Sequence, residues 1–183
     1  MRILLLNGNP DPGNTAWERS LDAWARTQVR EGNAVSRKDL RDLRIRFCTG
    51  CWSCWYTTPG LCAIRDDMAS LYPEMLGSDL TVWASPLVLG NVSALVKKTQ
   101  DRFIPLLHPF FELDRGEMHH RRRYPKDIDM GLIVGKGPTD TNEDLEIVRT
   151  LHERLARNGR GRLVLCQTIE YATEEMDHEK IDA

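Results

Sequence analysis

Short apolar runs, each followed by a loop and a helical pattern, recur along this chain of 183 residues and constrain its fold more than any other feature. The first run, Ile3–Leu6, ends at Asn7-Gly8 and is typical of a strand buried on both faces of a sheet. Four further strands are predicted at 34–40, 80–84, 128–134 and 163–169. Helices are predicted at 16–30, 67–77, 91–104 and 141–158. This alternation predicts an α/β fold with a parallel sheet and helices on both of its faces.

Such sheets bind ligands beyond the carboxyl ends of their strands, at the point where the strand order reverses. That rule selects loops 8–15, 86–91 and 135–140 in advance. Loop 8–15 offers backbone N–H groups, the Asn14 amide and the Thr15 hydroxyl to a phosphate; alternatively it is a tight turn with a helix cap. Loop 86–91 is an apolar segment that can lie along a flat aromatic ligand, or it is an ordinary strand-to-helix connection.

Four of the five cysteines lie close together with the spacing C-x2-C-x2-C-x7-C, at Cys48, Cys51, Cys54 and Cys62. The amino-terminal segment has no signal-peptide pattern, so we expect a reducing, cytoplasmic compartment in which clustered cysteines bind metal or carry chemistry. Zinc sites usually pair two separated C-x2-C units. Successive x2 steps are nearer to iron–sulfur runs, which favours a [4Fe–4S] cluster over zinc. Four free thiols remain the alternative, and Cys166, within a strand pattern, is expected in the core.

The bulk composition agrees with one domain over residues 1–183, interrupted by a cysteine-rich loop at 46–63 and an insertion at 105–127. The formal net charge is -2 and charged residues make up 28% of the chain, which gives no global attraction to nucleic acid or membrane. No apolar run reaches the roughly 20 residues that span a bilayer. We therefore expect neither membrane nor nucleic acid among the partners.

Three segments together resemble the NADPH-dependent FMN reductase-like proteins, and most closely their iron–sulfur flavoprotein branch: "NGNPDPGNTA", "CTGCWSC…GLC…RDDM" and "ASPLVLGNVSALVKKTQDR". The similarity runs in order from Met1 to about Arg102 and more loosely beyond. It implies a flavodoxin-like three-layer sandwich, with a five-stranded parallel sheet of order 2-1-3-4-5 and FMN at its carboxyl edge. The chain departs from the family at Asp11, where Arg or Lys is common, and at Val88-Leu89, where an aromatic pair is frequent.

The resemblance also implies particular site residues. The family's phosphate loop maps onto Asn9, Asn14, Thr15 and Ala16. Its contacts with the flavin ring map onto Pro86, Leu87, Val88, Leu89, Gly90 and Asn91, and we add Gly135 from the third loop. Cys48, Cys51, Cys54 and Cys62 fall on the motif that holds a [4Fe–4S] cluster. Aromatic contact with the flavin can come instead from Trp52, Trp55 and Tyr56, in the same chain or a neighbouring subunit.

These features predict an FMN-dependent oxidoreductase or electron-transfer flavoprotein. It would use NAD(P)H or a donor protein, and reduce a small-molecule acceptor or a redox protein, with the cluster as a possible relay. The cofactor carries such chemistry, so no catalytic side chain is predicted. We expect a homodimer or homotetramer, with the basic run 119–126 as a surface or intersubunit loop or a docking site for an anionic group. The alternatives are a non-catalytic electron carrier or redox sensor, and a zinc-bound or metal-free domain that has lost flavin.

Overall fold

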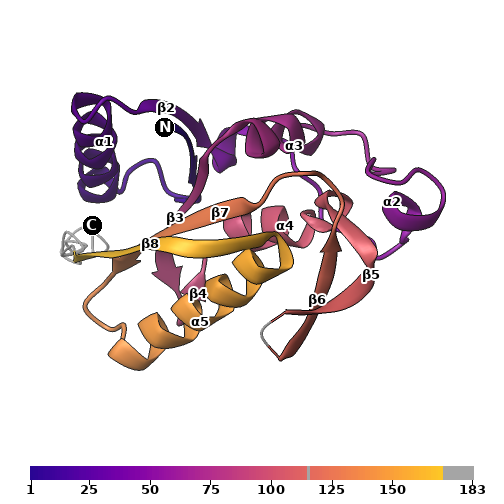
Figure 1. Cartoon of the computed structure of the whole chain (residues 1–183). Coiled ribbons are helices and arrows are strands. Elements are labelled where there is room, and N and C mark those ends of the chain that lie inside the picture. Colours follow the sequence, from indigo (N-terminus) through magenta and orange to yellow (C-terminus); the bar gives the residue numbers. More distant parts are fainter. Residues whose placement is uncertain (115, 171–183) are drawn as a thin grey trace, which may run out of the picture.

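A parallel sheet forms the centre of the computed structural model, which describes residues 1–114 and 116–170 (Figure 1). The order of its parallel strands is β2-β1-β3-β7-β8. Their bounds are Arg2–Asn7 for β1, Ala34–Asp39 for β2, Leu80–Val88 for β3, Ile128–Lys136 for β7 and Arg160–Glu170 for β8. Counted among themselves along the chain, these strands have the order 2-1-3-4-5, which confirms the predicted flavodoxin-like topology. A short strand, β4 (Asn91–Val92), was not predicted: it pairs antiparallel with the end of β3, so the sheet has six strands where five parallel ones were predicted.

Helices cover both faces of this sheet. Helix α1 (Thr15–Arg30) packs on one face, where Ile3 and Leu5 of β1 meet Trp17 and Leu21. Three helices pack on the other face: α3 (Met68–Gly77), α4 (Ala94–Asp101) and α5 (Asn142–Asn158). Because successive side chains of a strand point to opposite faces, the continuous apolar run of β1 serves both clusters at once.

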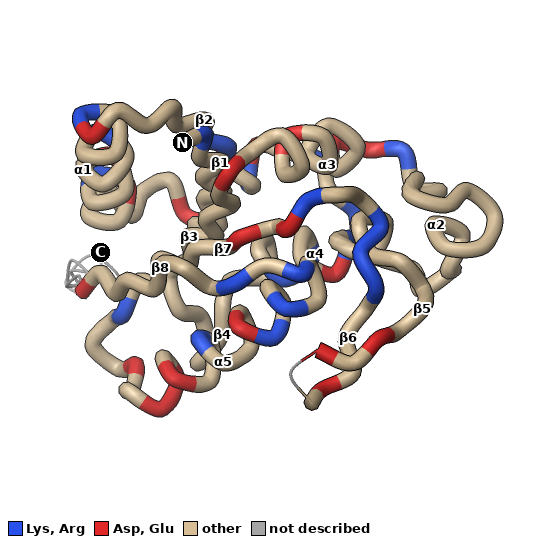
Figure 2. The backbone as a smooth tube through the Cα atoms, in the orientation of Figure 1, with Lys and Arg blue, Asp and Glu red and all other residues tan. Residues whose placement is uncertain are grey.

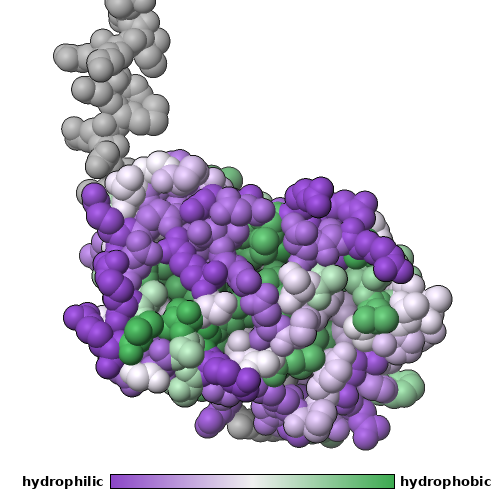
Figure 3. Space-filling model, turned by 90° about the horizontal axis from the view of Figure 1, so that it is seen from above, coloured by the Kyte–Doolittle hydropathy of each residue, from purple (hydrophilic) through white to green (hydrophobic). Residues whose placement is uncertain are grey.

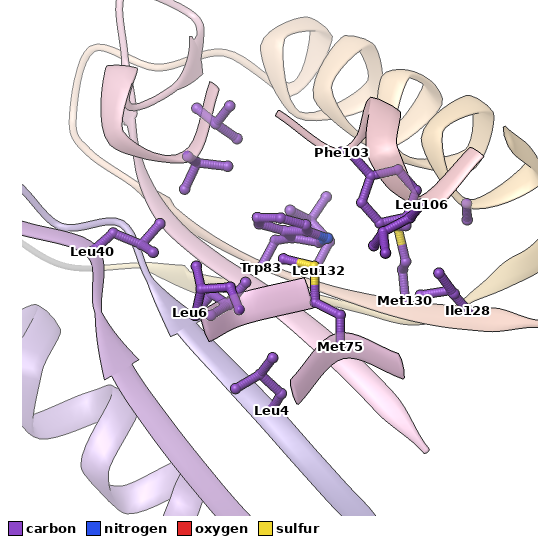
Figure 4. Packing of buried hydrophobic residues seen from close by; sticks show 14 of the residues in the cluster. Leu4, Leu6, Leu40, Met75, Trp83, Phe103, Leu106, Ile128, Met130 and Leu132 are labelled. Carbon is purple, nitrogen blue, oxygen red and sulfur yellow. The ribbon is translucent and has the colours of Figure 1, made fainter. Parts of the chain in front are cut away.

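The larger of the two cores surrounds Trp83 of β3. Figure 4 shows this indole between Leu6, Met75 and Leu132, which come from β1, α3 and β7. Trp83 is fully buried, as are these three neighbours. The buried strands are therefore held rigidly on this face, and their carboxyl ends are fixed relative to one another.

Two element boundaries differ from the sequence prediction. Strand β3 was expected to end at Ala84, but it continues to Val88 and pairs Pro86 with Gly135 of β7. Strand β1 stops pairing with β3 at Ala84, so the missing N–H of Pro86 removes no hydrogen bond to β1. Helix α4 is shorter than the predicted 91–104, because Asn91 and Val92 form β4 and Ser93 caps the helix.

Two excursions leave the sheet. The first follows β2 and contains the 3₁₀ turn η1 (Leu40–Asp42), the cysteine-rich loop and the short helix α2 (Ser53–Tyr56). The second follows α4 and contains η2 (Ile104–Leu106) and a separate hairpin, β5 (Leu107–Asp114) with β6 (Glu117–Arg122). Both lie at the same end of the molecule, opposite to α1 (Figure 1).

Large apolar side chains also reach the surface. The view from above shows hydrophobic residues gathered between hydrophilic margins (Figure 3). In the described part of the chain, the two excursions hold many of the exposed apolar residues: Phe47, Trp52, Tyr56, Leu61, Phe110, Phe111, Leu113 and Met118. Such accumulation is typical of surfaces that meet a partner. No helix within residues 1–114 and 116–170 has both the length and the apolar character needed to cross a membrane.

Candidate functional site

Hydrogen bonds of Gly8 join loop 8–15 to the end of β3 and to the start of α4. The backbone N–H of Gly8 donates to the Ala84 carbonyl at 2.7 Å, and the Ser93 hydroxyl donates to the Gly8 carbonyl at 2.5 Å. A Cβ atom on Gly8 would lie 2.2 Å from Cγ2 of Val96, so the close approach requires glycine. The first predicted loop and the segment that follows β3 therefore form one unit.

The third loop joins this unit through β7 and α5. Gly135 lies beside Pro86 in the parallel register of β7 and β3. At the tip of the β3–β4 hairpin, a Cβ on Gly90 would lie 2.6 Å from Oδ1 of Asp144, which belongs to the capping box of α5. The structure thus brings together all three loops that the strand-order rule selected.

The segment 86–91 is a β-hairpin, so only some of the residues predicted to contact the flavin ring are exposed. Pro86 and Leu87 are buried within β3, whereas Val88 is 44% exposed and Leu89 is 101% exposed. Leu89 and Gly90 have φ angles of 51° and 73°, the left-handed pair of a type I′ turn. Leucine is uncommon in that conformation, so the turn holds an apolar side chain in solvent at the cost of local strain. Asn91 is exposed and pairs with Val88.

The other predicted residues of loop 8–15 have distinct places. Asn9 is buried, and its amide donates to the Asp11 carbonyl at 2.6 Å. Asn14 caps α1, because its Oδ1 accepts from the Trp17 N–H at 3.1 Å. Thr15 and Ala16 form the first turn of α1, with Thr15 exposed and Ala16 half-buried. Asn14 is therefore the residue that caps α1, while Thr15 stays accessible at the positive end of this helix.

An ion-pair network beneath this loop was not predicted from the sequence. The Glu18 carboxylate accepts from the Asn9 amide and from Arg41, each at 2.8 Å, and it also contacts Arg37. Asp39 accepts from the Asn7 amide at 2.7 Å and from Arg37 at 2.8 Å. The network joins the carboxyl ends of β1 and β2 to the first turn of α1.

The same network fixes the charges of its members. Burial raises the pKa of Glu18, but hydrogen bonds from Asn9, Arg37 and Asn7 outweigh it, so the net pKa is lowered. The pKa of Asp39 is lowered in the same way, by Asn7 and Arg37 against the opposing effect of burial. Both carboxylates are therefore ionised and compensated by two arginines, and they support loop 8–15 from below.

The four clustered cysteines line a single pocket. Its wall also includes Trp52, Ile104 and Arg102, which come from the cysteine loop, η2 and the end of α4. The Trp55 indole N–H donates to the Ile104 carbonyl at 3.1 Å and attaches the loop to η2. Cys48 and Cys51 are exposed, whereas Cys54 and Cys62 are half-buried. The fifth cysteine, Cys166, was predicted in the core, but it lies exposed in β8.

The thiols in this pocket differ in acidity. Hydrogen bonds from the Ser53 backbone and the Thr49 hydroxyl lower the pKa of Cys51. Burial, followed by the neighbouring Cys62, raises the pKa of Cys54. Because neighbouring thiols raise the pKa of Cys54, the cysteines of the pocket lie within electrostatic range of one another. Across residues 1–114 and 116–170, however, no group of three or more His, Cys, Asp or Glu side chains is arranged to hold a metal ion.

The cysteine pocket and the three loops lie at opposite ends of α4. Ser93 begins this helix beside Gly8, and Arg102 follows its last turn beside the cysteines. Eight helical residues span about 12 Å. Figure 1 shows the same separation, with α2 at one end of the molecule and α1 at the other. The expected contact of Trp52, Trp55 and Tyr56 with a flavin stays a prediction, and the separation across α4 favours a neighbouring subunit as its source.

The first half of the basic run 119–126 belongs to strand β6, and residues 123–126 form the bend that follows it. Figure 2 shows its Lys and Arg residues in succession along β6 and beyond. Arg122 pairs with Asp127, and the Arg123 guanidinium donates to the Leu107 carbonyl at 3.0 Å. His119 is buried between Glu117 and Asn158, at 3.1 Å from each. The His120 ring lies between the rings of Trp55 and Phe111, with centroids at 5.1 and 4.6 Å and tilted planes. Arg122 and Arg123 thus make contacts within the hairpin and the segment that follows it, whereas His119 attaches the hairpin to α5.

The strand order and the three joined loops define a flavodoxin-like protein. The model of the NADPH-dependent FMN reductase family matches residues 1–122. The chain therefore belongs to the NADPH-dependent FMN reductase family.

Two curated relatives have the name iron–sulfur flavoprotein. One, from Archaeoglobus fulgidus, is 32% identical over 108 residues, which cover 59% of this chain and 48% of the relative. The other, from Methanocaldococcus jannaschii, is 33% identical over 109 residues, which cover 58% of this chain and 53% of the relative. The matched part thus spans about half the length of these relatives.

Solved structures show the same fold at lower sequence identity. An NAD(P)H:quinone oxidoreductase from Methanothermobacter marburgensis has a TM-score of 0.67 at 16% identity, covering 98% of this chain and 87% of that one. An FMN-dependent NADH-azoreductase from Bacillus anthracis, solved with FMN, has a TM-score of 0.64 at 14% identity, covering 94% and 87%. These similarities establish the architecture of the domain.

Proposed function

We propose that this chain binds FMN at the edge formed by loops 8–15, 86–91 and 135–140, and acts as an NAD(P)H-dependent oxidoreductase. One observation carries the proposal: Gly8 and Ser93 join the first loop to the end of β3, where Pro86 lies beside Gly135. Three loops from three adjacent strands thus meet at the place where such sheets bind ligands. Family membership and the FMN-dependent neighbour support the same cofactor.

The residues at this edge fit the parts of FMN. Thr15 and Ala16 would hold the phosphate at the first turn of α1, whose positive end favours an anion. Val88 and Leu89 would cover the ring system and exclude water from it, because both present apolar surface at the hairpin tip. Bound FMN supplies hydride and single-electron transfer, while the chain supplies position and electrostatics.

Flavin content and reduction test this proposal. Protein purified without oxygen should release FMN on denaturation, identified by chromatography. Addition of NADH or NADPH should bleach the flavin absorbance before any acceptor is added. Thr15→Ala should weaken FMN binding, whereas Thr27→Ala, farther along the same helix, should not. Protein without flavin, and unable to bind it when it is supplied, would overturn the proposal.

A second outcome would select the electron-carrier alternative. In that case the protein would contain FMN, but neither nicotinamide would reduce it. A reduced redox protein or dithionite would then still bleach the flavin. Steady-state oxidation of NADH and NADPH with a quinone acceptor separates the two functions, because a carrier without a nicotinamide pocket shows no turnover.

We also propose that the cysteine pocket takes an iron–sulfur cluster. Support comes from four thiols that line one pocket, and from the name of the curated relatives. Since the described side chains are not arranged as a metal-ligating group, loop 46–63 would have to close around the cluster. Iron, sulfide and zinc should be measured in protein purified anaerobically. Cys51→Ala should remove the iron and Cys166→Ala should not, while zinc without iron would refute the cluster.

We further propose a homodimer or homotetramer in which the cysteine pocket of one copy serves the flavin of another. The pocket and the loops of one chain lie on opposite ends of α4, and exposed apolar residues surround the pocket. Sedimentation should give a mass of two or four chains. Mixing a flavin-deficient Gly8→Ala copy with a cluster-deficient Cys51→Ala copy should restore electron transfer between the two groups. A monomer in solution would refute this arrangement.

A further inference from the structure

The carboxylate of Asp11 lies over the backbone at the entrance to α1. Its Oδ1 accepts a hydrogen bond from the Gly13 N–H at 2.8 Å. A Cβ atom on Gly13 would lie 3.0 Å from the same oxygen, so the carboxylate is packed against this glycine. Asp11 is exposed, and therefore its charge faces the solvent side of loop 8–15, where a ligand would approach.

Other backbone donors of the loop are also satisfied within the chain. The Asn9 N–H donates to Asn7 Oδ1 at 3.1 Å, and the Asp11 N–H donates to Asn9 Oδ1 at 3.2 Å. In the first turn of α1, the Trp17 N–H likewise donates to Asn14 Oδ1 at 3.1 Å. Phosphate-binding loops use such N–H groups to hold the anion. Here a phosphate that uses the Gly13 N–H must first displace the carboxylate of Asp11.

Asp11 also differs from the other acidic residues near loop 8–15 in having no ion-pair partner among the described residues. Glu18 and Asp39 are each paired with Arg37 and Arg41. Within residues 1–114 and 116–170, Asp11 makes no ion pair. Its negative charge is therefore uncompensated by an adjacent cation, and it acts on whatever binds at the first turn of α1.

We propose that Asp11 determines which flavin this loop selects, by opposing the phosphate of FMN and so reducing the preference for FMN over riboflavin. This inference rests on the proposed function, because it assumes that the three loops bind a flavin. Two like charges a few ångströms apart near a protein surface repel enough to change affinity about 10-fold or more. Riboflavin has the same ring system and no phosphate, so the repulsion does not act on it.

Titration of flavin-free protein with FMN and with riboflavin, followed by quenching of flavin fluorescence, tests the inference. Asp11→Asn retains an oxygen that can accept from the Gly13 N–H, and it removes the charge. We expect this variant to bind FMN about 10-fold more tightly and riboflavin within about twofold of the wild type. The FMN effect should shrink at high salt, because exposed charges are screened. Asp11→Ser should act in the same direction.

Glu31→Gln provides the matched control. It removes the same charge at the other end of α1, a helix of 16 residues or about 24 Å, beyond the Debye length of roughly 8–10 Å at physiological salt. It should change neither affinity.

Two results would overturn the inference. The ratio of the two affinities can stay the same in wild type and Asp11→Asn, either because neither affinity changes or because both flavins tighten equally; equal tightening would indicate a change of loop shape rather than of charge. Failure of either flavin to bind any variant would overturn the proposed function and this inference with it, whereas binding with an unchanged ratio overturns the inference alone.

Discussion

The carboxylate of Asp66 accepts two hydrogen bonds from the guanidinium of Arg102, at 2.9 and 3.0 Å. Their side chains are 5% and 1% exposed, and the pair joins the start of α3 to the end of α4. Asp66 also accepts from the Met68 N–H at 3.2 Å, while Arg102 donates to the Arg46 carbonyl at 2.8 Å. Arg102 also lines the cysteine pocket, so its pairing with Asp66 ties the wall of that pocket to the core.

Removing one charge of this pair should be strongly destabilising. Asp66→Asn leaves the Arg102 guanidinium buried without its counter-ion, and such changes cost about 3–5 kcal/mol. Urea denaturation monitored by fluorescence measures the loss. The exposed pair of Arg149 and Glu153 is the control, because Glu153→Gln should cost less than about 0.5 kcal/mol. Equal effects of the two substitutions would contradict this prediction.

Burial of His152 should make the fold sensitive to mild acid. Burial lowers the pKa of His152, and a hydrogen bond to the Val148 carbonyl opposes this only in part. Its Nδ1 lies 2.8 Å from that carbonyl, and its Nε2 lies 2.8 Å from the Gln100 amide nitrogen, an arrangement that suits the neutral ring. The unfolded chain binds the proton more tightly, with a pKa near 6.5, so stability should fall as the pH drops below about 6.5.

Proton NMR titration of His152, assigned by its absence in His152→Gln, measures this pKa directly. The loss of stability between about pH 7 and pH 5 should be smaller in His152→Gln than in the wild type. A titration midpoint at or above about 6.5 in the folded protein would contradict the prediction.

A side chain at Gly8 should separate the first loop from the end of β3. Gly8→Ala places a methyl group 2.2 Å from Val96 and 3.1 Å from the Ser93 hydroxyl. Overpacking of this kind costs about 1–3 kcal/mol, and we expect weaker flavin binding as well. In Gly77→Ala the new methyl group meets nothing within 4 Å, so that helix position should be neutral or slightly stabilised. Denaturation midpoints and flavin affinity should be measured together, and an undisturbed Gly8→Ala would contradict the model of joined loops.

The sheet could be predicted from the sequence because its central strands are continuous apolar runs between clear loop signals. The end of β3 could not be predicted from the sequence, because the extension of this strand depends on pairing Pro86 with Gly135, nearly 50 residues away along the chain. The three loops were selected correctly as neighbours by the strand-order rule. The role of these loops as a flavin site stays a prediction.

Charged residues account for much of what the sequence did not reveal. Glu18, Arg37 and Asp39 have the pattern of ordinary solvated positions, and their network forms only when α1 packs beside β2. Arg102 ends a charged helix and gives no sign that it will be buried beneath the cysteines. The cysteine spacing predicted four thiols facing one metal site, and the structure brings them to one pocket; the place of this pocket at the far end of α4 depends on contacts with η2.

The strained turn at Leu89 should lower the stability of the fold and favour the binding of FMN. Leu89 has a φ of 51° and is followed by Gly90 at 73°, and Asn-Gly is the favoured sequence for this type I′ turn. Leu89→Asn should therefore stabilise the fold by about 0.5–1 kcal/mol, since asparagine adopts the left-handed conformation with less strain. The same change removes an apolar side chain that we expect to cover the flavin, so FMN affinity should fall. Denaturation and flavin titration of this variant check both effects, and a gain or no change in affinity would show that Leu89 does not contact the cofactor.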